Sequence, residues 1–208
     1  MADHFLGKLK VTGEDFVEAD GAPVVERADA LIALLSERAG PEVAALFAEP
    51  LISRGNDEAP PTVSWYTTQE GTPRPLETLS PGERERVERY LSDHLRPVRA
   101  LAEEPGSADL AMGALTTFGA SDVLVVGDKP IIVNWGLMPG AKGANAAARP
   151  AHYAQTIGRF LPLSETPRPP QPARAAPAAA AEGPHAPPPR GAAHNAPTPE
   201  LRREQGVT

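Results

Sequence analysis

The chain changes composition at about Ser164, and this change most limits what it can fold into. All ten aromatic residues lie at or before Phe160, whereas residues 164–208 hold 11 of the 25 prolines and only two large aliphatic side chains. Such a segment cannot bury enough apolar surface to offset the entropy of ordering it. The sequence therefore predicts one globular domain over residues 1–163, followed by a disordered Pro/Ala-rich tail or linker over residues 164–208.

Charge and cysteine content exclude several classes of function. Residues 1–163 carry 23 acidic and 15 basic side chains. Because an acidic domain repels a phosphate backbone, we expect no nucleic acid among its partners. The chain has no cysteine, which removes disulfides, thiolate nucleophiles and zinc–sulfur sites.

The sequence predicts a cytoplasmic domain without direct membrane insertion. Its N-terminus carries Asp3 and lacks an apolar run of signal-peptide length. The longest uncharged stretches, residues 110–121 and 130–141, are 12 residues each. A membrane-spanning helix needs roughly 20 apolar residues, so neither stretch is long enough.

The clearest local signal is a capping box at the start of a helix. Ser80 precedes Pro81, and Glu83 lies at the third helical position. We expect Pro97 to kink this helix or to end it near Arg96, because proline lacks a backbone donor. Further helices are expected, from apolar spacing and from Gly, Pro and Ser boundaries, over residues 27–38, 41–48, 98–104, 108–115 and 152–160.

The strongest strand signal is a β-hairpin in which residues 122–126 and 131–135 flank a Gly-Asp-Lys-Pro turn. Both arms are almost continuously apolar, so we expect them at the centre of a sheet that helices cover on one face. Strands are also predicted over residues 5–11, as an edge strand with Phe5 and Leu9 at matching positions, and over residues 62–68. The predicted fold class is α+β: a small antiparallel sheet with a central β-hairpin packed against helices.

A glycine-rich loop from Gly136 to Asn145 is a candidate ligand site. Its glycines would let backbone amides approach an anion, and Lys142 would add positive charge. The loop departs from the phosphate-loop pattern, because Pro139 removes an amide and no Lys-Ser/Thr pair opens a following helix. It is therefore either a phosphate or nucleotide site or a flexible surface loop.

No other pattern predicts chemistry. The five histidines lack metal-ligand spacing, and no serine lies in a nucleophile elbow, so we expect no catalytic residue, no metal and no cofactor. Trp135 is either a core residue or an aromatic anchor for a partner. On the second alternative, Asn134, Trp135, Gly136 and His152 would bind a protein partner.

Five phrases together resemble a known family: Asp20-Gly-Ala-Pro-Val, Ala48-Glu-Pro, Val63-Ser-Trp-Tyr, Asp122-Val-Leu-Val-Val-Gly and Val133-Asn-Trp-Gly-Leu. They are similar to the N-terminal domain of proteobacterial Srf-type virulence-factor proteins, over about residues 5–163. The resemblance implies large partner proteins encoded in the same operon and no established catalytic residues. Members often continue through a Pro-rich linker into a membrane helix, and no such helix is predicted within residues 1–208.

We therefore expect a non-enzymatic protein-interaction or scaffold domain on a flexible tether, in a virulence-associated bacterial assembly. One alternative is a nucleotide- or phosphate-ligand-binding domain, or an enzyme, that uses the loop from Gly136 to Asn145. Another is a truncated fragment of a longer membrane-anchored protein. The sequence predicts no oligomeric state.

Overall fold

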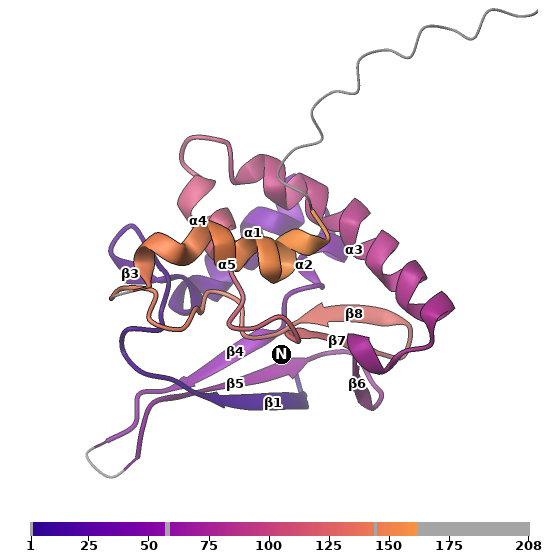
Figure 1. Ribbon diagram of the computed structural model, residues 1–208, viewed down its shortest axis with the longest axis horizontal. Coiled ribbons are helices and arrows are strands. Elements are labelled where there is room, and N and C mark those ends of the chain that lie inside the picture. The colour runs from indigo at the N-terminus through magenta and orange to yellow at the C-terminus, as the bar shows by residue number, and fades with distance from the viewer. Residues whose placement is uncertain (1, 57–58, 144, 162–208) are drawn as a thin grey trace, which may run out of the picture. The chain divides into compact units, whose positions relative to one another are not determined.

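The computed structural model describes residues 2–56, 59–143 and 145–161 (Figure 1). The predicted disordered tail over residues 164–208 lies outside the described residues. Where it is described, the chain has the predicted α+β class. Its strands form two three-stranded antiparallel sheets and one short ribbon rather than a single sheet.

The first sheet has the order β1-β5-β4, and the second has the order β6-β7-β8. The predicted hairpin is present as β7 and β8, but only β7 is central in its sheet. The outer edge of β8 meets residues 46–48 instead, where Ile132 N donates to Leu46 O at 2.6 Å and Ala48 N to Ile132 O at 3.0 Å. The strands are β1 (His4–Lys10), β2 (Glu18–Ala19), β3 (Ala22–Pro23), β4 (Glu49–Ser53), β5 (Thr62–Thr67), β6 (Pro73–Pro75), β7 (Val123–Val126) and β8 (Lys129–Ile132).

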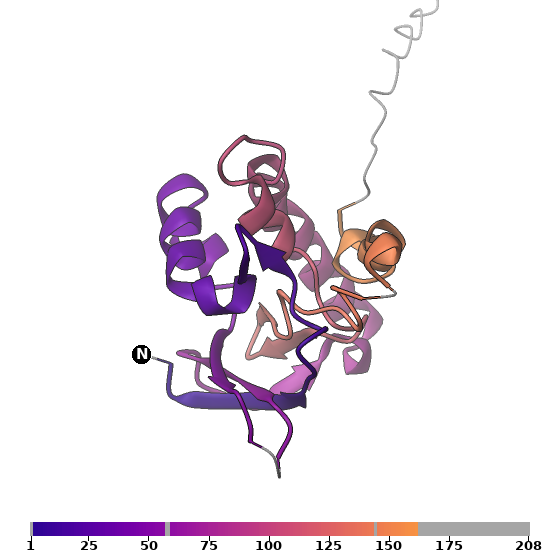
Figure 2. The ribbon, with the colours of Figure 1, turned by 90° about the vertical axis from the view of Figure 1, so that its left-hand side faces the viewer.

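The helices lie on one side of the β1-β5-β4 sheet, and both views show its other side without a covering element among the described residues (Figures 1 and 2). The α-helices are α1 (Ala28–Arg38), α2 (Pro41–Ala44), α3 (Pro81–Leu101), α4 (Ala108–Ala114) and α5 (Arg149–Gln155). Four 3₁₀ helices complete the fold: η1 (Val24–Arg27), η2 (Leu76–Thr78), η3 (Ala146–Ala148) and η4 (Ile157–Arg159).

The helix α3 begins as predicted and ends later than predicted. The Glu83 carboxylate accepts hydrogen bonds from Ser80 N at 3.2 Å and from Ser80 Oγ at 2.6 Å. The helix then continues through Pro97 to Leu101, so of the two alternatives, a kink at Pro97 or an end near Arg96, the second is wrong. Val98 and Leu101 are 0% and 3% exposed, and their burial offsets the backbone hydrogen bond that proline removes.

A β-bulge in β1 reverses the predicted alternation of that strand. Phe5 pairs with Tyr66 and Leu9 with Val63, and the register shifts between Phe5 and Gly7. Val63 is buried and Tyr66 is only half-buried, because they point to opposite faces of β5. Phe5 and Leu9 therefore lie on opposite faces of the sheet, which corrects the prediction from sequence alternation.

An aromatic cluster joins the two sheets in the core. Trp135 packs against Trp65 with 5.5 Å between ring centroids and against Phe47 with 6.1 Å. The Trp135 indole N–H donates to Ala48 O at 2.9 Å. Trp65, Trp135 and Phe47 are 1%, 0% and 5% exposed, so this cluster fixes how β5, β8 and residues 46–48 meet.

Candidate functional site

Two of the predicted partner-binding residues are structural in this fold. Trp135 has no exposed surface, so it takes the core alternative and would reach a partner only if the fold opened. Gly136 has a φ of +70°, and a Cβ there would lie 2.9 Å from Val25 Cγ1. Only glycine fits this backbone conformation beside Val25 without strain.

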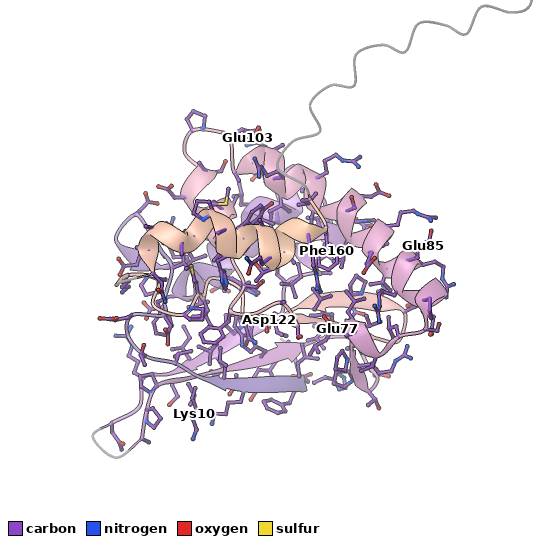
Figure 3. The ribbon with its side chains drawn as sticks, viewed as in Figure 1. Lys10, Glu77, Glu85, Glu103, Asp122 and Phe160 are labelled. Carbon is purple, nitrogen blue, oxygen red and sulfur yellow. The ribbon has the colours of Figure 1, made fainter. Side chains whose placement is uncertain are left out.

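The other two predicted residues lie in a polar cluster around Asp122, which Figure 3 shows between α5 and the sheets. Asp122 Oδ1 accepts a hydrogen bond from Asn134 Nδ2 at 2.7 Å, and its Oδ2 accepts one from Gly119 N at 2.5 Å. His152 Nε2 lies 2.6 Å from Thr117 O, which it can reach as a donor. The structure thus brings Asn134 and His152 to the same loop, residues 116–122.

The polar groups of this cluster hold the loop rather than offer a reactive atom. Burial raises the pKa of Asp122, against the hydrogen bonds from Asn134 and Gly119 and the charge of His152, which lower it. The Thr117 hydroxyl donates to Gly119 O at 3.2 Å and so has its own acceptor. Within residues 2–56, 59–143 and 145–161, no group of three or more His, Asp or Glu side chains could hold a metal ion. These hydrogen bonds therefore have a structural role: they hold α5 and the end of the β7–β8 hairpin to the loop over residues 116–122.

The glycine-rich loop is held by acidic residues from the N-terminal part of the chain. Gly140 N donates to Asp15 Oδ1 at 2.9 Å, and Lys142 N donates to Glu14 O at 3.0 Å. The Lys142 ammonium pairs with Glu18 at 2.5 Å. Burial acts to raise the Asp15 pKa, but the hydrogen bonds from Gly140 and Thr12 together hold it below its usual value. A phosphate would meet these carboxylates instead of free amides, so the geometry gives the phosphate-loop alternative no support.

A different surface stands out on the uncovered side of the β1-β5-β4 sheet, which we call the outer face. Phe5 and Leu51 are 55% and 60% exposed, and they are the large hydrophobic side chains that are exposed among the described residues. The Phe5 ring meets Tyr66 edge-on, with 5.6 Å between centroids. Strand register gives the outer face three rows: Phe5, Tyr66 and Glu49; Lys8, Ser64 and Leu51; Lys10, Thr62 and Ser53.

A groove adjoins the outer face at its Tyr66 end. It has a volume of about 570 Å³ and lies between α1, α2 and the neighbouring ends of β4 and β5. Glu49 and Tyr66 belong to both the groove and the outer face, so the two surfaces are continuous. The rest of the groove combines polar residues, Ser36, Thr67 and Thr68, with apolar ones, among them Ala28, Ile32, Ala45 and Pro50.

Apart from Glu49, which both surfaces share, the charged side chains of the two surfaces have opposite signs. Lys8 and Lys10 stand on the outer face, and Figure 3 shows Lys10 on the side of the sheet away from the helices. The groove is lined by Asp29 and Glu49 and by no basic residue. A ligand that crosses both surfaces therefore meets carboxylates at one end and ammonium groups at the other.

Sequence reasoning missed both surfaces. The alternation of Thr62, Ser64 and Tyr66 with buried neighbours was a usable signal, because it marks one face of β5 as outward. The pairing of β1 and β4 on either side of β5, and the bulge that turns Phe5 outward, depend on contacts between distant segments.

Comparisons with protein-family models, with curated proteins and with solved structures returned no match. Among the helices that the structure describes, none is both long and apolar enough to cross a membrane. The interpretation of the site therefore depends on its own geometry.

Proposed function

We propose that residues 1–163 form a non-enzymatic protein-interaction domain whose partner docks on the outer face. The observation that carries this proposal is the gathering of Phe5 and Leu51, the two exposed large hydrophobic side chains among the described residues, on one uncovered sheet face. Single exposed hydrophobic residues are normal on protein surfaces, whereas a patch of them marks a binding site. Phe5 and Tyr66 would be aromatic anchors of the kind that dominate interface energetics.

The edges of the sheet favour docking on its face over addition of a strand. β1 is an edge strand with a bulge and with Lys8 and Lys10 along it, and both features oppose pairing with another strand. β4, at the opposite edge, contains Pro50, which has no backbone donor. A partner would thus gain more from the side chains of the outer face than from edge hydrogen bonds.

The polar groups that sequence analysis singled out support binding less well. Asp122 and Asn134 hydrogen-bond to each other, and Lys142 is paired with Glu18. A ligand at either place would first have to break these contacts. The resemblance to Srf-type proteins, which implies large protein partners, agrees with an interaction domain in a virulence-associated assembly.

The test compares two double variants of the full chain as bait for native partners. Phe5→Ser with Leu51→Ser removes the apolar centre of the outer face without touching the core. Glu85→Ser with Arg89→Ser is the matched control, because both residues are exposed on α3 and form a local ion pair at 2.7 Å. We expect the first variant to lose proteins that the wild type retains and the control to keep them. Loss in both variants, or in neither, would contradict the proposal.

A further inference from the structure

We propose that the groove between α1, α2 and β4 binds a basic side chain of the partner, an arginine or a lysine. The same partner segment would then cross the outer face with its apolar residues. This inference rests on the proposed function, because it assigns partner chemistry to the groove that continues the outer face. At about 570 Å³, the groove falls within the range of roughly 300 to 1,000 Å³ that ligand sites occupy.

The first argument for a basic side chain is the negative charge of the groove. Asp29 stands in the first turn of α1, and Glu49 belongs to β4 on the other side of the groove. Neither carboxylate forms an ion pair with another described residue. Glu49 Oε2 accepts a hydrogen bond from Ala2 N at 3.0 Å, and this backbone amide carries no charge that would neutralise the carboxylate. A guanidinium or ammonium group between the two carboxylates would supply the missing charge.

The apolar lining carries the second step. Ile32, Ala45 and Pro50 line the groove beside the carboxylates, and each keeps accessible surface. Arginine and lysine have long aliphatic stems that pack on apolar surface while their charged ends stay near water or carboxylates. Tyr66 adds an aromatic ring at the groove, and such rings attract cations. A small inorganic cation would use none of this apolar surface.

The third argument is the order of charged and apolar side chains from the groove across the outer face. Successive rows of the outer face are about 7 Å apart, since each row is two residues further along a strand. From the groove, a segment would meet Tyr66 and Phe5 in the first row, Leu51 and Lys8 in the second, and Lys10 in the third. The complementary order is basic, apolar and acidic. The net charge of −7 disfavours a second copy of this chain as the occupant, because two such chains repel each other.

The test uses nuclear magnetic resonance on the full-length, nitrogen-15-labelled protein with three synthetic peptides. The first reads Arg-Leu-Ala-Leu-Glu with blocked ends, the second has neutral citrulline in place of arginine, and the third has glutamate there. We expect the arginine peptide to shift the amide signals of Ile32, Ala45 and Leu51. The citrulline peptide should bind roughly tenfold more weakly, as expected for loss of a partly desolvated cation contact. Equal affinities, no binding by any peptide, or shifts confined to other surfaces would overturn the inference.

Variants supply an independent measurement. Asp29→Asn with Glu49→Gln removes both charges, and glutamine keeps an oxygen that can accept the Ala2 N–H. This double variant should weaken the arginine peptide to the level of the citrulline peptide. Glu85→Gln with Asp93→Asn removes two exposed charges from α3 and should leave binding unchanged. Equal weakening in both variants would show that only net charge matters and would overturn the inference.

The two proposals fail in different ways. If all three peptides shift Leu51 equally and leave Ile32 unmoved, the outer face remains an interaction surface and the groove assignment is wrong. If the Phe5→Ser, Leu51→Ser variant retains every native partner, the outer face is not the docking surface, whatever the peptides do.

Discussion

At the scale of single residues, the two tryptophans show that side chains far apart in the sequence build one core. Trp65 and Trp135 come from strands or strand ends far apart in sequence, yet their rings lie 5.5 Å apart in the core. Their burial agrees with the core alternative for Trp135 and leaves the partner alternative without an accessible side chain. The exposed aromatic side chain is Phe5, which the sequence alternation placed on the same face as the half-buried Leu9.

Replacement of Trp135 by alanine should strongly destabilise the domain. The side chain is fully buried and its indole N–H bonds to Ala48 O, so Trp135→Ala should cost about 3 to 5 kcal/mol in unfolding free energy. Phe5→Ala, at a 55% exposed position, should cost much less. Urea unfolding followed by circular dichroism measures both, and a similar small loss for the two would show that Trp135 is not part of the core.

The pH dependence of stability should report on Asp122. Burial raises its folded pKa above the ordinary value of 3.8, so the stability tied to its protonated form is complete below the unfolded pKa and is lost as pH rises through the folded pKa. Asp122→Asn cannot titrate. The unfolding free energy of the wild type, relative to this variant, should therefore fall as pH rises from about 4 and then level off. An increase over the same range would mean that the folded pKa is lowered.

At the scale of elements, the signals that were predictable are local. The capping box at Ser80 and the β7–β8 hairpin each lie within a few residues. The division into two sheets and the continuation of α3 past Pro97 were not predictable, because distant contacts decide them. The outer face and the groove were not predictable for the same reason, since β1, β4 and α1, which are distant in the sequence, build them together.

Ser80→Ala tests the start of α3. The change removes the Ser80 Oγ contact to Glu83 at 2.6 Å and one side of the capping box, and it should cost about 1 kcal/mol in unfolding free energy. Ser121→Ala, at an exposed position before Asp122, is the matched control and should be close to neutral. Chemical denaturation of the two variants compares them, and equal losses would show that the cap contributes nothing specific.

At the scale of the whole molecule, one side of the β1-β5-β4 sheet packs into the core, and no described element covers the other side. Helices cover one side of the β1-β5-β4 sheet (Figure 2), and strand register places Phe5, Leu51 and Tyr66 on the uncovered side. The core around the two tryptophans is closed to solvent, since their side chains are 1% and 0% exposed.

Removal of residues 164–208 should therefore leave the domain folded. Those residues contain two large aliphatic side chains and no aromatic one, so they have little surface to contribute to a core. The truncated and full-length proteins should unfold at the same temperature in differential scanning calorimetry. A clearly lower midpoint for the truncated protein would contradict the division of the chain at Ser164.

Photo-crosslinking in the native cell tests the central claim most directly. A benzophenone amino acid is placed at Leu51 or Ser64 on the outer face and, as a control, at Glu85 on α3, which Figure 3 shows far from Lys10. The outer-face proposal predicts the same adduct from positions 51 and 64 and none from position 85. Adducts from position 85 alone, or equal yields at all three positions, would contradict it.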